Sequence, residues 1–146
     1  MIQIREMSLE DIQQVAGIEE SIFSIPWSEK SFEESLNSQN TLFIVAEKEH
    51  EILGYLGMYL FLETADISNV AVAKEYRRQH IAKRMMEDIL RRAKDRGVRQ
   101  VTLEVRETNV PAIQLYEGMG FQEAGIRKNY YKEPVENALI MWKQNL

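Results

Sequence analysis

The stretch VAVAKEYRRQHIAKRMM, from Val70 to Met86, predicts the end of a strand, a charged turn and the start of an amphipathic helix. Apolar residues at Ile81, Met85 and Ile89 recur every four positions, as they do on the buried face of a helix. A strand, a basic turn and a helix are the usual order of a phosphate-binding site, because the first helical turn offers free N–H groups and the positive end of the helix dipole. The turn contains no glycine, so the stretch alone also fits an ordinary basic helix start.

Four basic side chains surround the predicted helix start, namely Arg77, Arg78, Lys83 and Arg84. Cations near a helix N-terminus interact unfavourably with its dipole. Their presence therefore favours an anionic ligand, rather than helix stability, as the explanation. A solvated basic surface is the alternative interpretation.

Outward from this stretch, the hydrophobic periodicity predicts an α/β fold in a single domain that spans residues 1–146. Alternating and β-branched segments predict strands at residues 2–5, 41–47, 52–62, 65–73, 100–106, 121–127 and 138–143. Capping signals predict helices that begin at Ser8, Ser28, about Gln79 and Asn109. Because most connections are short, the expected architecture is a mixed, mostly antiparallel sheet of about seven strands flanked by about four helices.

The composition excludes several kinds of site. The chain has no cysteine, so disulfides, thiolate nucleophiles and cysteine-based metal centres are excluded. Its histidines, His50 and His80, are far apart in the sequence, and we expect no metal. No apolar run approaches the roughly 20 residues that cross a bilayer, and the N-terminus lacks a signal-peptide pattern. We therefore expect a cytoplasmic protein that does not enter a membrane.

Charge is distributed unevenly along the chain. Residues 1–70 hold 13 acidic and 3 basic side chains, whereas residues 71–146 hold 10 acidic and 15 basic ones. This asymmetry predicts that one end of the molecule suits a cationic partner and the other an anionic one, unless the solvated helix faces simply differ. The overall net charge of −5 argues against direct nucleic-acid binding, which usually needs a basic domain.

A second group of motifs follows the basic helix. Leu103-Glu104-Val105-Arg106 is followed by Thr108-Asn109, Leu115-Tyr116 and Gly120-Phe121. Together with the basic turn and the chain order, this pattern resembles the Gcn5-related N-acetyltransferase (GNAT) superfamily over essentially the whole chain. The resemblance implies that the turn after the fourth strand holds the pyrophosphate of acetyl-CoA. It also implies that the fourth and fifth strands splay apart to admit the pantetheine and the thioester.

Three segments narrow the resemblance. Residues 26–32 (PWSEKSF), 103–106 (LEVR) and 127–131 (RKNYY) are similar to bacterial ribosomal-protein alanine N-acetyltransferases of the RimI type. This similarity implies that Glu104 is the general base and Tyr116 the general acid, with an acceptor site formed by Trp27, Tyr130 and Tyr131. The backbone contacts to acetyl-CoA that it implies come from Val70, Ala71, Val72, Arg78, Gln79, His80, Ile81, Ala82 and Lys83, and the side-chain contact comes from Asn109.

The chemistry of acetyl transfer agrees with these roles. An amine attacks a thioester only when it is neutral, and a peptide α-amino group with a pKa of about 7.7–8.0 is roughly one-tenth neutral at pH 7. A carboxylate such as Glu104 can therefore remove its proton through a water molecule without an extreme pKa of its own. A tyrosine hydroxyl is a suitable donor to the departing thiolate.

The sequence departs from the family pattern at His80 and Ala82, where the family usually shows glycine. Glycine lets the backbone approach a pyrophosphate closely. The N–H groups that bind phosphate are nevertheless supplied by any residue except proline. We therefore expect His80 to affect the affinity for the cofactor and not the fold, with its side chain either pointing away from the ligand or contacting it as a weak donor.

Three functions remain open at this level. The first is an acetyl-CoA-dependent Nα-acetyltransferase that modifies the N-terminal residue, alanine, of a basic small-subunit ribosomal protein and acts as a monomer or weak dimer. The second is a GNAT acetyltransferase of a small-molecule amine such as a polyamine. The third is a non-catalytic coenzyme A-binding module, against which the presence of both Glu104 and Tyr116 argues.

Overall fold

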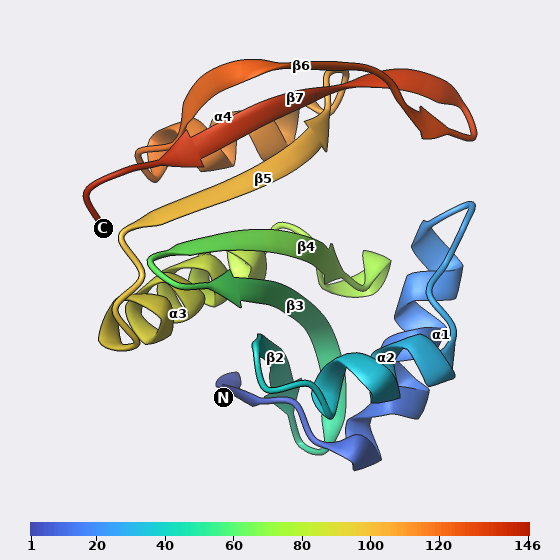
Figure 1. Cartoon of the computed structure of the whole chain (residues 1–146). Coiled ribbons are helices and arrows are strands. Elements are labelled where there is room, and N and C mark those ends of the chain that lie inside the picture. The colour runs from blue at the N-terminus through green and yellow to red at the C-terminus, as the bar shows by residue number, and fades with distance from the viewer.

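Seven strands form one sheet in the order β1-β2-β3-β4-β5-β7-β6 (Figure 1). Neighbouring strands are antiparallel except β4 and β5, which run parallel. The expected mixed, mostly antiparallel sheet is therefore confirmed. The computed structural model describes residues 1–146, and its strands are β1 (Gln3–Glu6), β2 (Thr41–Lys48), β3 (Glu51–Phe61), β4 (Thr64–Val72), β5 (Gln100–Arg106), β6 (Gln122–Lys132) and β7 (Val135–Lys143).

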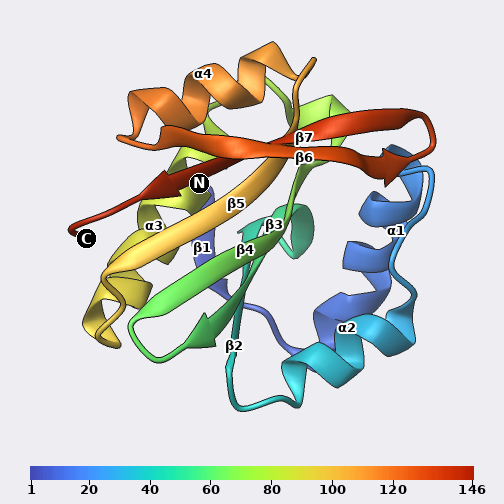
Figure 2. The ribbon, with the colours of Figure 1, turned by 45° about the horizontal axis from the view of Figure 1, so that its top comes forward.

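Helices cover both faces of the sheet (Figures 1 and 2). α1 and α2 pack on one face over β2, β3 and β4, around a buried aromatic group that includes Phe32 and Tyr55. α3 and α4 pack on the other face, where the larger core of 21 buried residues includes Met85 and Leu103. The α-helices are α1 (Ile12–Ile22), α2 (Glu29–Leu36), α3 (Ile81–Asp95) and α4 (Val110–Gly118), and the short 3-10 helices are η1 (Leu9–Asp11) and η2 (Lys74–Tyr76).

The predicted helix caps at Ser28 and Asn109 are confirmed. The Ser28 Oγ accepts a hydrogen bond from the Ser31 amide at 3.1 Å, which begins α2. The Asn109 Oδ1 accepts one from the Ala112 amide at 3.3 Å, which begins α4. Each oxygen satisfies one of the amides that a helix start leaves without an internal partner.

Two sets of predicted boundaries were wrong. The helix predicted from about Gln79 begins at Ile81, because His80 has the left-handed backbone of a cap and not a helical one. The last two strands extend well beyond residues 121–127 and 138–143, as far as Lys132 and back to Val135. Their pairing shifts register between Arg127 and Tyr131, and this irregularity lets a polar segment that looks like a loop continue as a strand.

The sheet opens into a fork between β4 and β5. These strands pair over only four positions, from Thr64 opposite Gln100 to Ile67 opposite Leu103. Beyond that point β4 pairs only with β3, and β5 pairs only with β7, so the two strands diverge (Figure 1). The expected splay of the central strands is confirmed.

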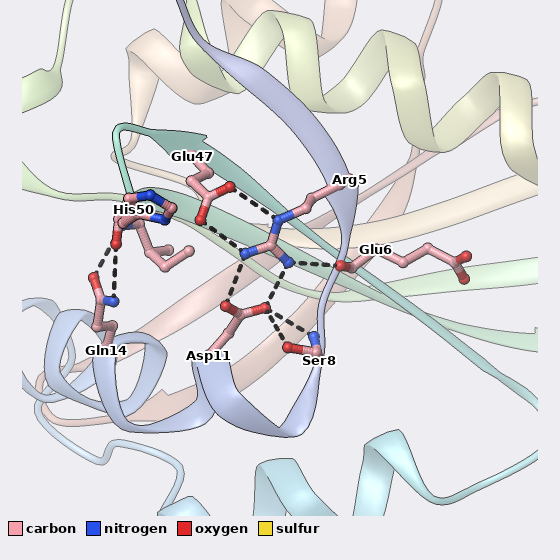
Figure 3. A network of polar contacts seen from close by, with 8 residues as sticks. Arg5, Glu6, Ser8, Asp11, Gln14, Glu47 and His50 are labelled. Atoms are coloured by element: carbon pink, nitrogen blue, oxygen red, sulfur yellow. Dashed lines mark hydrogen bonds and ion pairs between the residues drawn. The ribbon is translucent and has the colours of Figure 1, made fainter.

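An ion-pair network fixes the start of the helical layer to the sheet (Figure 3). Arg5 of β1 binds Asp11 of η1 at 2.8 Å and Glu47 of β2 at 3.0 Å. Asp11 also accepts a hydrogen bond from the Ser8 amide at 2.8 Å, as in a capping box at the predicted helix start. Burial alone would raise the pKa of Asp11, but the hydrogen bonds from Arg5 and Ser8 outweigh it and hold that pKa below its usual 3.8. The entry into α1 is thereby tied to two strands.

Candidate active site

The turn between η2 and α3 has the features of an anion site. Arg84 is the first α3 residue whose amide donates within the helix, to the His80 carbonyl at 3.0 Å. The amides of residues 81–83 therefore have no helical partner. Arg77 and Arg78 are exposed and form no ion pair. Free amides, the helix dipole and unpaired cations together fit the pyrophosphate predicted here.

Two residues of this turn have left-handed backbone conformations. Arg78 has a φ of 67° and His80 a φ of 59°. A left-handed conformation costs a residue with a Cβ roughly 1–2 kcal/mol, a cost that glycine avoids. The glycine that the family shows at His80 therefore has a conformational reason, in addition to the close approach of the backbone inferred from the sequence.

Inside the fork, β4 has a partner on one side only. The Ala73 amide donates to the Leu53 carbonyl of β3 at 2.8 Å. Because successive amides of a strand point in opposite directions, the Ala71 amide also faces β3, whereas those of Val70 and Val72 face the fork. Val70 and Val72 can therefore make the predicted amide contacts with acetyl-CoA. The predicted amide contact of Ala71 does not fit, since that amide is used within the sheet.

Glu104 lies on β5, one residue beyond the last β4–β5 pair. Its side chain is 17% exposed, and its Oε1 accepts from the Arg127 Nε of β6 at 3.3 Å. Burial raises the pKa of Glu104 above its usual value, the nearby charge of Asp66 raises it further, and Arg127 opposes both. A carboxylate at the fork with a raised pKa has the properties of a general base.

Asp66 was not identified from the sequence. It is half-buried on β4, where burial raises its pKa, and its Oδ1 accepts from the Thr102 hydroxyl at 2.9 Å. The signal in the sequence was weak, because a single acidic residue near a strand end is common. Only the register of β4 against β5 places it near Glu104.

Tyr116 lies on the α3 and α4 side of the sheet, in the larger core. It is 6% exposed and its ring packs against Phe121 with centroids 5.9 Å apart. Burial raises the pKa of Tyr116 to about 12, with no hydrogen bond contributing to this shift. The hydroxyl therefore keeps its proton at neutral pH, as a donor to a leaving thiolate must.

The predicted acceptor residues Tyr130 and Tyr131 lie near the tip of the β6–β7 hairpin. Their rings meet edge to face at 5.1 Å, and the Arg106 guanidinium lies 4.3 Å above the Tyr131 ring. Burial raises the pKa of Tyr131 to about 12, interactions with Tyr130, Glu104 and Tyr116 add to this effect, and the charge of Arg106 opposes it. Tyr131 therefore lies within electrostatic reach of both predicted catalytic residues.

Trp27, the third predicted acceptor residue, lies between α1 and α2. Its ring packs against Phe32 at 5.2 Å and Phe43 at 6.3 Å, on the α1 and α2 side. Its amide donates to Glu19 Oε2 at 3.0 Å, and the other carboxylate oxygen of Glu19 accepts from the Tyr55 hydroxyl. Glu19 was missed by sequence analysis, although it continues the buried positions of α1, and it fixes the segment that carries Trp27.

Residues that flank the two predicted acceptor segments are in direct contact. The Ser24 hydroxyl, between α1 and α2, donates to the Glu133 carbonyl in the β6–β7 turn at 2.5 Å. Figure 2 shows this turn beside the end of α1. Segments more than 100 residues apart in the sequence therefore lie side by side at one end of the fork.

Comparison with known proteins identifies the family. Residues 12–121 match the acetyltransferase (GNAT) family. The chain belongs to the GNAT acetyltransferase family. The [ribosomal protein bS18]-alanine N-acetyltransferase of Escherichia coli K12 is 33% identical to this GNAT chain over 143 residues, which cover 97% of this chain and 96% of that protein. A Bacillus subtilis protein provisionally given the same name is 41% identical over 140 residues, 95% of this chain and 93% of its own.

Solved GNAT structures share the fold. The crystal structure of the ribosomal-protein-S18-alanine N-acetyltransferase from Escherichia coli superposes with a TM-score of 0.92 at 32% identity, covering 99% of this chain and 94% of that one. Ard1 from Thermoplasma volcanium superposes with a TM-score of 0.91 at 26% identity, covering 99% and 98%. The resemblance found in the sequence is confirmed, and the protein is an acetyltransferase that uses acetyl-CoA.

Four of the predicted residues lie near one another. Glu104 acts on the pKa of both Tyr130 and Tyr131, and Tyr116 acts on that of Tyr131. Trp27 lies in the segment between α1 and α2, and the hydrogen bond from Ser24 to Glu133 joins this segment to the β6–β7 hairpin. No group of three or more His, Asp or Glu side chains is arranged to hold a metal ion. None of the helices is both long and apolar enough to cross a bilayer.

Proposed function

We propose that this GNAT enzyme transfers the acetyl group of acetyl-CoA to the α-amino group of an N-terminal alanine on a small-subunit ribosomal protein in the cytoplasm. The observation that carries the proposal is a half-buried carboxylate, Glu104, at the point where β4 and β5 begin to diverge. The names of relatives at 33% and 41% identity over nearly the whole chain support the choice of acceptor.

In this proposal acetyl-CoA is held mainly by the backbone. The amides of residues 81–83 bind the pyrophosphate, and exposed Arg77 and Arg78 add favourable charge. The amides of Val70 and Val72 bind the pantetheine arm inside the fork. The Asn109 side chain, whose Oδ1 already caps α4, has its amide nitrogen left for the cofactor.

In the proposed reaction, Glu104 acts on the acceptor nitrogen and Tyr116 acts on the leaving sulfur. Glu104 accepts a proton from the acceptor ammonium through a water molecule, and the neutral nitrogen attacks the thioester carbon. The new C–N bond forms as the C–S bond breaks, and Tyr116 donates its proton to the departing sulfur. The acylated nitrogen then loses its second proton, through water, to the Tyr116 oxygen, which restores the hydroxyl. Because the pKa of Glu104 is raised, the carboxylate is a stronger base than an exposed glutamate, although it must be ionised to act.

The experiment that tests this proposal compares acceptors at fixed acetyl-CoA. The substrates are a peptide that copies the alanine N-terminus of the small-subunit ribosomal protein, the same peptide already Nα-acetylated but with its lysines free, and spermidine. We expect turnover of the first peptide alone. Glu104→Gln keeps the side-chain shape and should lower kcat on that peptide by about 10²–10⁴-fold, the usual share of general-base catalysis. Faster turnover of spermidine than of the peptide would instead support a small-amine acetyltransferase, and no turnover of any amine would support a coenzyme A-binding module.

A further inference from the structure

Two carboxylates flank the point at which the sheet opens. Asp66 pairs with Thr102 one position before the end of the β4–β5 ladder, and Glu104 follows one position after that end. Side chains two apart on a strand share a face, so Glu104 is on the face of Thr102. The Thr102 hydroxyl donates to Asp66, which fixes the Asp66 carboxylate on this face as well.

The negative charges of Asp66 and Glu104 are not fully balanced by positive charges of the protein. Asp66 has no ion-pair partner, and its one hydrogen-bond donor is the neutral Thr102 hydroxyl. Arg127 is the cation that acts on both carboxylates, and it is paired with Glu104 at 3.3 Å. Two acids and one base leave a deficit of one positive charge. A half-buried charge of this kind is costly unless a cation approaches it.

The other neighbours of Asp66 do not supply that cation. Tyr59 lies opposite it on β3, and the Tyr59 hydroxyl is bonded to Ser35 at 2.8 Å. On β6, Tyr130 carries no charge at neutral pH, because burial and then the charges of Glu104 and Asp66 raise its pKa. The main contacts of α1 and α2 with the sheet are with β2, β3 and β4, so the part of this face formed by β5 and β7 lies outside them. The missing charge can therefore come from a ligand that enters over this face.

We propose that Asp66 is an acceptor-binding residue. Its carboxylate, together with that of Glu104, holds the α-ammonium group of the incoming N-terminus at the point where β4 and β5 begin to diverge. This inference rests on the proposed function. An α-amino group is about nine-tenths protonated at pH 7, so the acceptor arrives as a cation with three N–H donors. A direct charge-assisted hydrogen bond to Asp66 and a water-bridged one to Glu104 orient it and complete the local charge. The proton then passes to Glu104 through water, Asp66 remains ionised, and the neutral nitrogen attacks.

The test measures binding of two peptides to the enzyme with coenzyme A present. One peptide has a free N-terminal alanine and the other is its Nα-acetylated form, which lacks the ammonium group. Asp66→Asn should weaken binding of the free-amine peptide by about 10–100-fold, the loss expected for a charge-assisted hydrogen bond. It should leave binding of the acetylated peptide and of acetyl-CoA within about twofold. Asp66→Glu, which keeps the charge, should restore part of the loss, and Thr102→Val, which keeps Asp66, should have a smaller effect.

The pH profile gives a second readout. Because the charge of Asp66 raises the pKa of Glu104, Asp66→Asn should move the acidic limb of kcat to lower pH. Equal loss for both peptides would show that Asp66 only supports the fold, and equal affinity of wild type and Asp66→Asn for the free-amine peptide would also overturn the inference. If the wild-type enzyme acetylates no N-terminal peptide, the proposed function itself fails, which is a separate outcome.

Discussion

At the scale of single residues, His80 shows why a family preference can be broken without loss of the fold. Its left-handed backbone favours glycine, but the amides that follow it are supplied by other residues. We expect His80→Gly to raise the free energy of unfolding by about 1 kcal/mol. In chemical denaturation, Ala82→Gly is the matched control, because it places glycine in a regular helix and should destabilise by about 1 kcal/mol. Affinity for acetyl-CoA should stay equal or increase in His80→Gly, and a large loss would mean that the imidazole itself holds the ligand.

Tyr116 is the second residue whose role can be isolated. Tyr116→Phe removes one hydroxyl and little volume from the core, so the fold should persist. With acetyl-CoA the variant should be at least about tenfold slower, within the range of general-acid catalysis. Because the pKa of Tyr116 is about 12, this deficit should be constant from pH 7 to about pH 10.

A donor with a different leaving group tests whether the slower turnover of Tyr116→Phe reflects lost proton donation to the thiolate. An acetyl aryl thioester whose thiolate is a stable anion needs little help to depart, so Tyr116→Phe should be nearly as fast as wild type with this donor. Wild-type turnover of the aryl donor is the required control. Equal slowing with both donors would assign Tyr116 to positioning, and normal rates with both would remove it from the proton path.

At the scale of elements, the segment between α1 and α2 depends on one buried carboxylate. Glu19 is 3% exposed and holds the Trp27 amide and the Tyr55 hydroxyl. Glu19→Gln leaves one of these contacts weakened, so the segment should loosen. We expect the KM for the acceptor peptide to rise about 3–10-fold, because one impaired hydrogen bond is worth roughly 1 kcal/mol. The KM for acetyl-CoA should not change, and Glu20→Gln, on the exposed neighbour, should change neither. An equal rise in both KM values would show that Glu19 does not act on acceptor binding alone.

The Arg5 network predicts a stability effect with a pH signature. Arg5→Met removes the partner of Asp11, whose side chain is only 8% exposed, and should cost about 1–3 kcal/mol of unfolding free energy. Arg96→Met, at an exposed pair separated by 4.0 Å, should cost less than about 0.5 kcal/mol.

The sign of the pH effect follows from Asp11. Its pKa is lower in the folded chain than the usual 3.8, so its contribution is present above pH 3.8 and is lost as the pH falls through the folded value. The difference between wild type and Arg5→Met in urea denaturation should therefore shrink below pH 3.8. A difference that stays constant with pH would contradict the assignment of the stabilisation to the Arg5–Asp11 pair.

Element identity was predictable where local signals were strong. The caps at Ser28 and Asn109 and the strand 100–106 were all found from periodicity and capping chemistry. The β6–β7 hairpin was predicted too short, because its polar tip is held by pairing across a register shift and not by hydrophobic alternation. The roles of Asp66 and Glu19 depend on which strand or loop faces them, and that information is not local in sequence.

At the scale of the whole molecule, the uneven charge along the chain agrees with a reaction between two oppositely charged substrates. Basic side chains predominate in residues 71–146, which contain the turn after β4, and acidic side chains predominate in residues 1–70, which contain the segment between α1 and α2 that carries Trp27. A basic protein N-terminus and an anionic cofactor can therefore approach the fork from different parts of the surface.

The proposed acetylation of an N-terminal alanine on a small-subunit ribosomal protein, with Glu104 as the base, can be tested in cells. The measurement is mass spectrometry of ribosomal-protein N-termini from cells with and without the gene. We predict that one small-subunit protein with an alanine N-terminus loses its Nα-acetyl group in cells without the gene, and that the wild-type gene restores the group whereas Glu104→Gln does not. Ribosomal N-termini that are identical with and without the gene would show that this enzyme does not acetylate them.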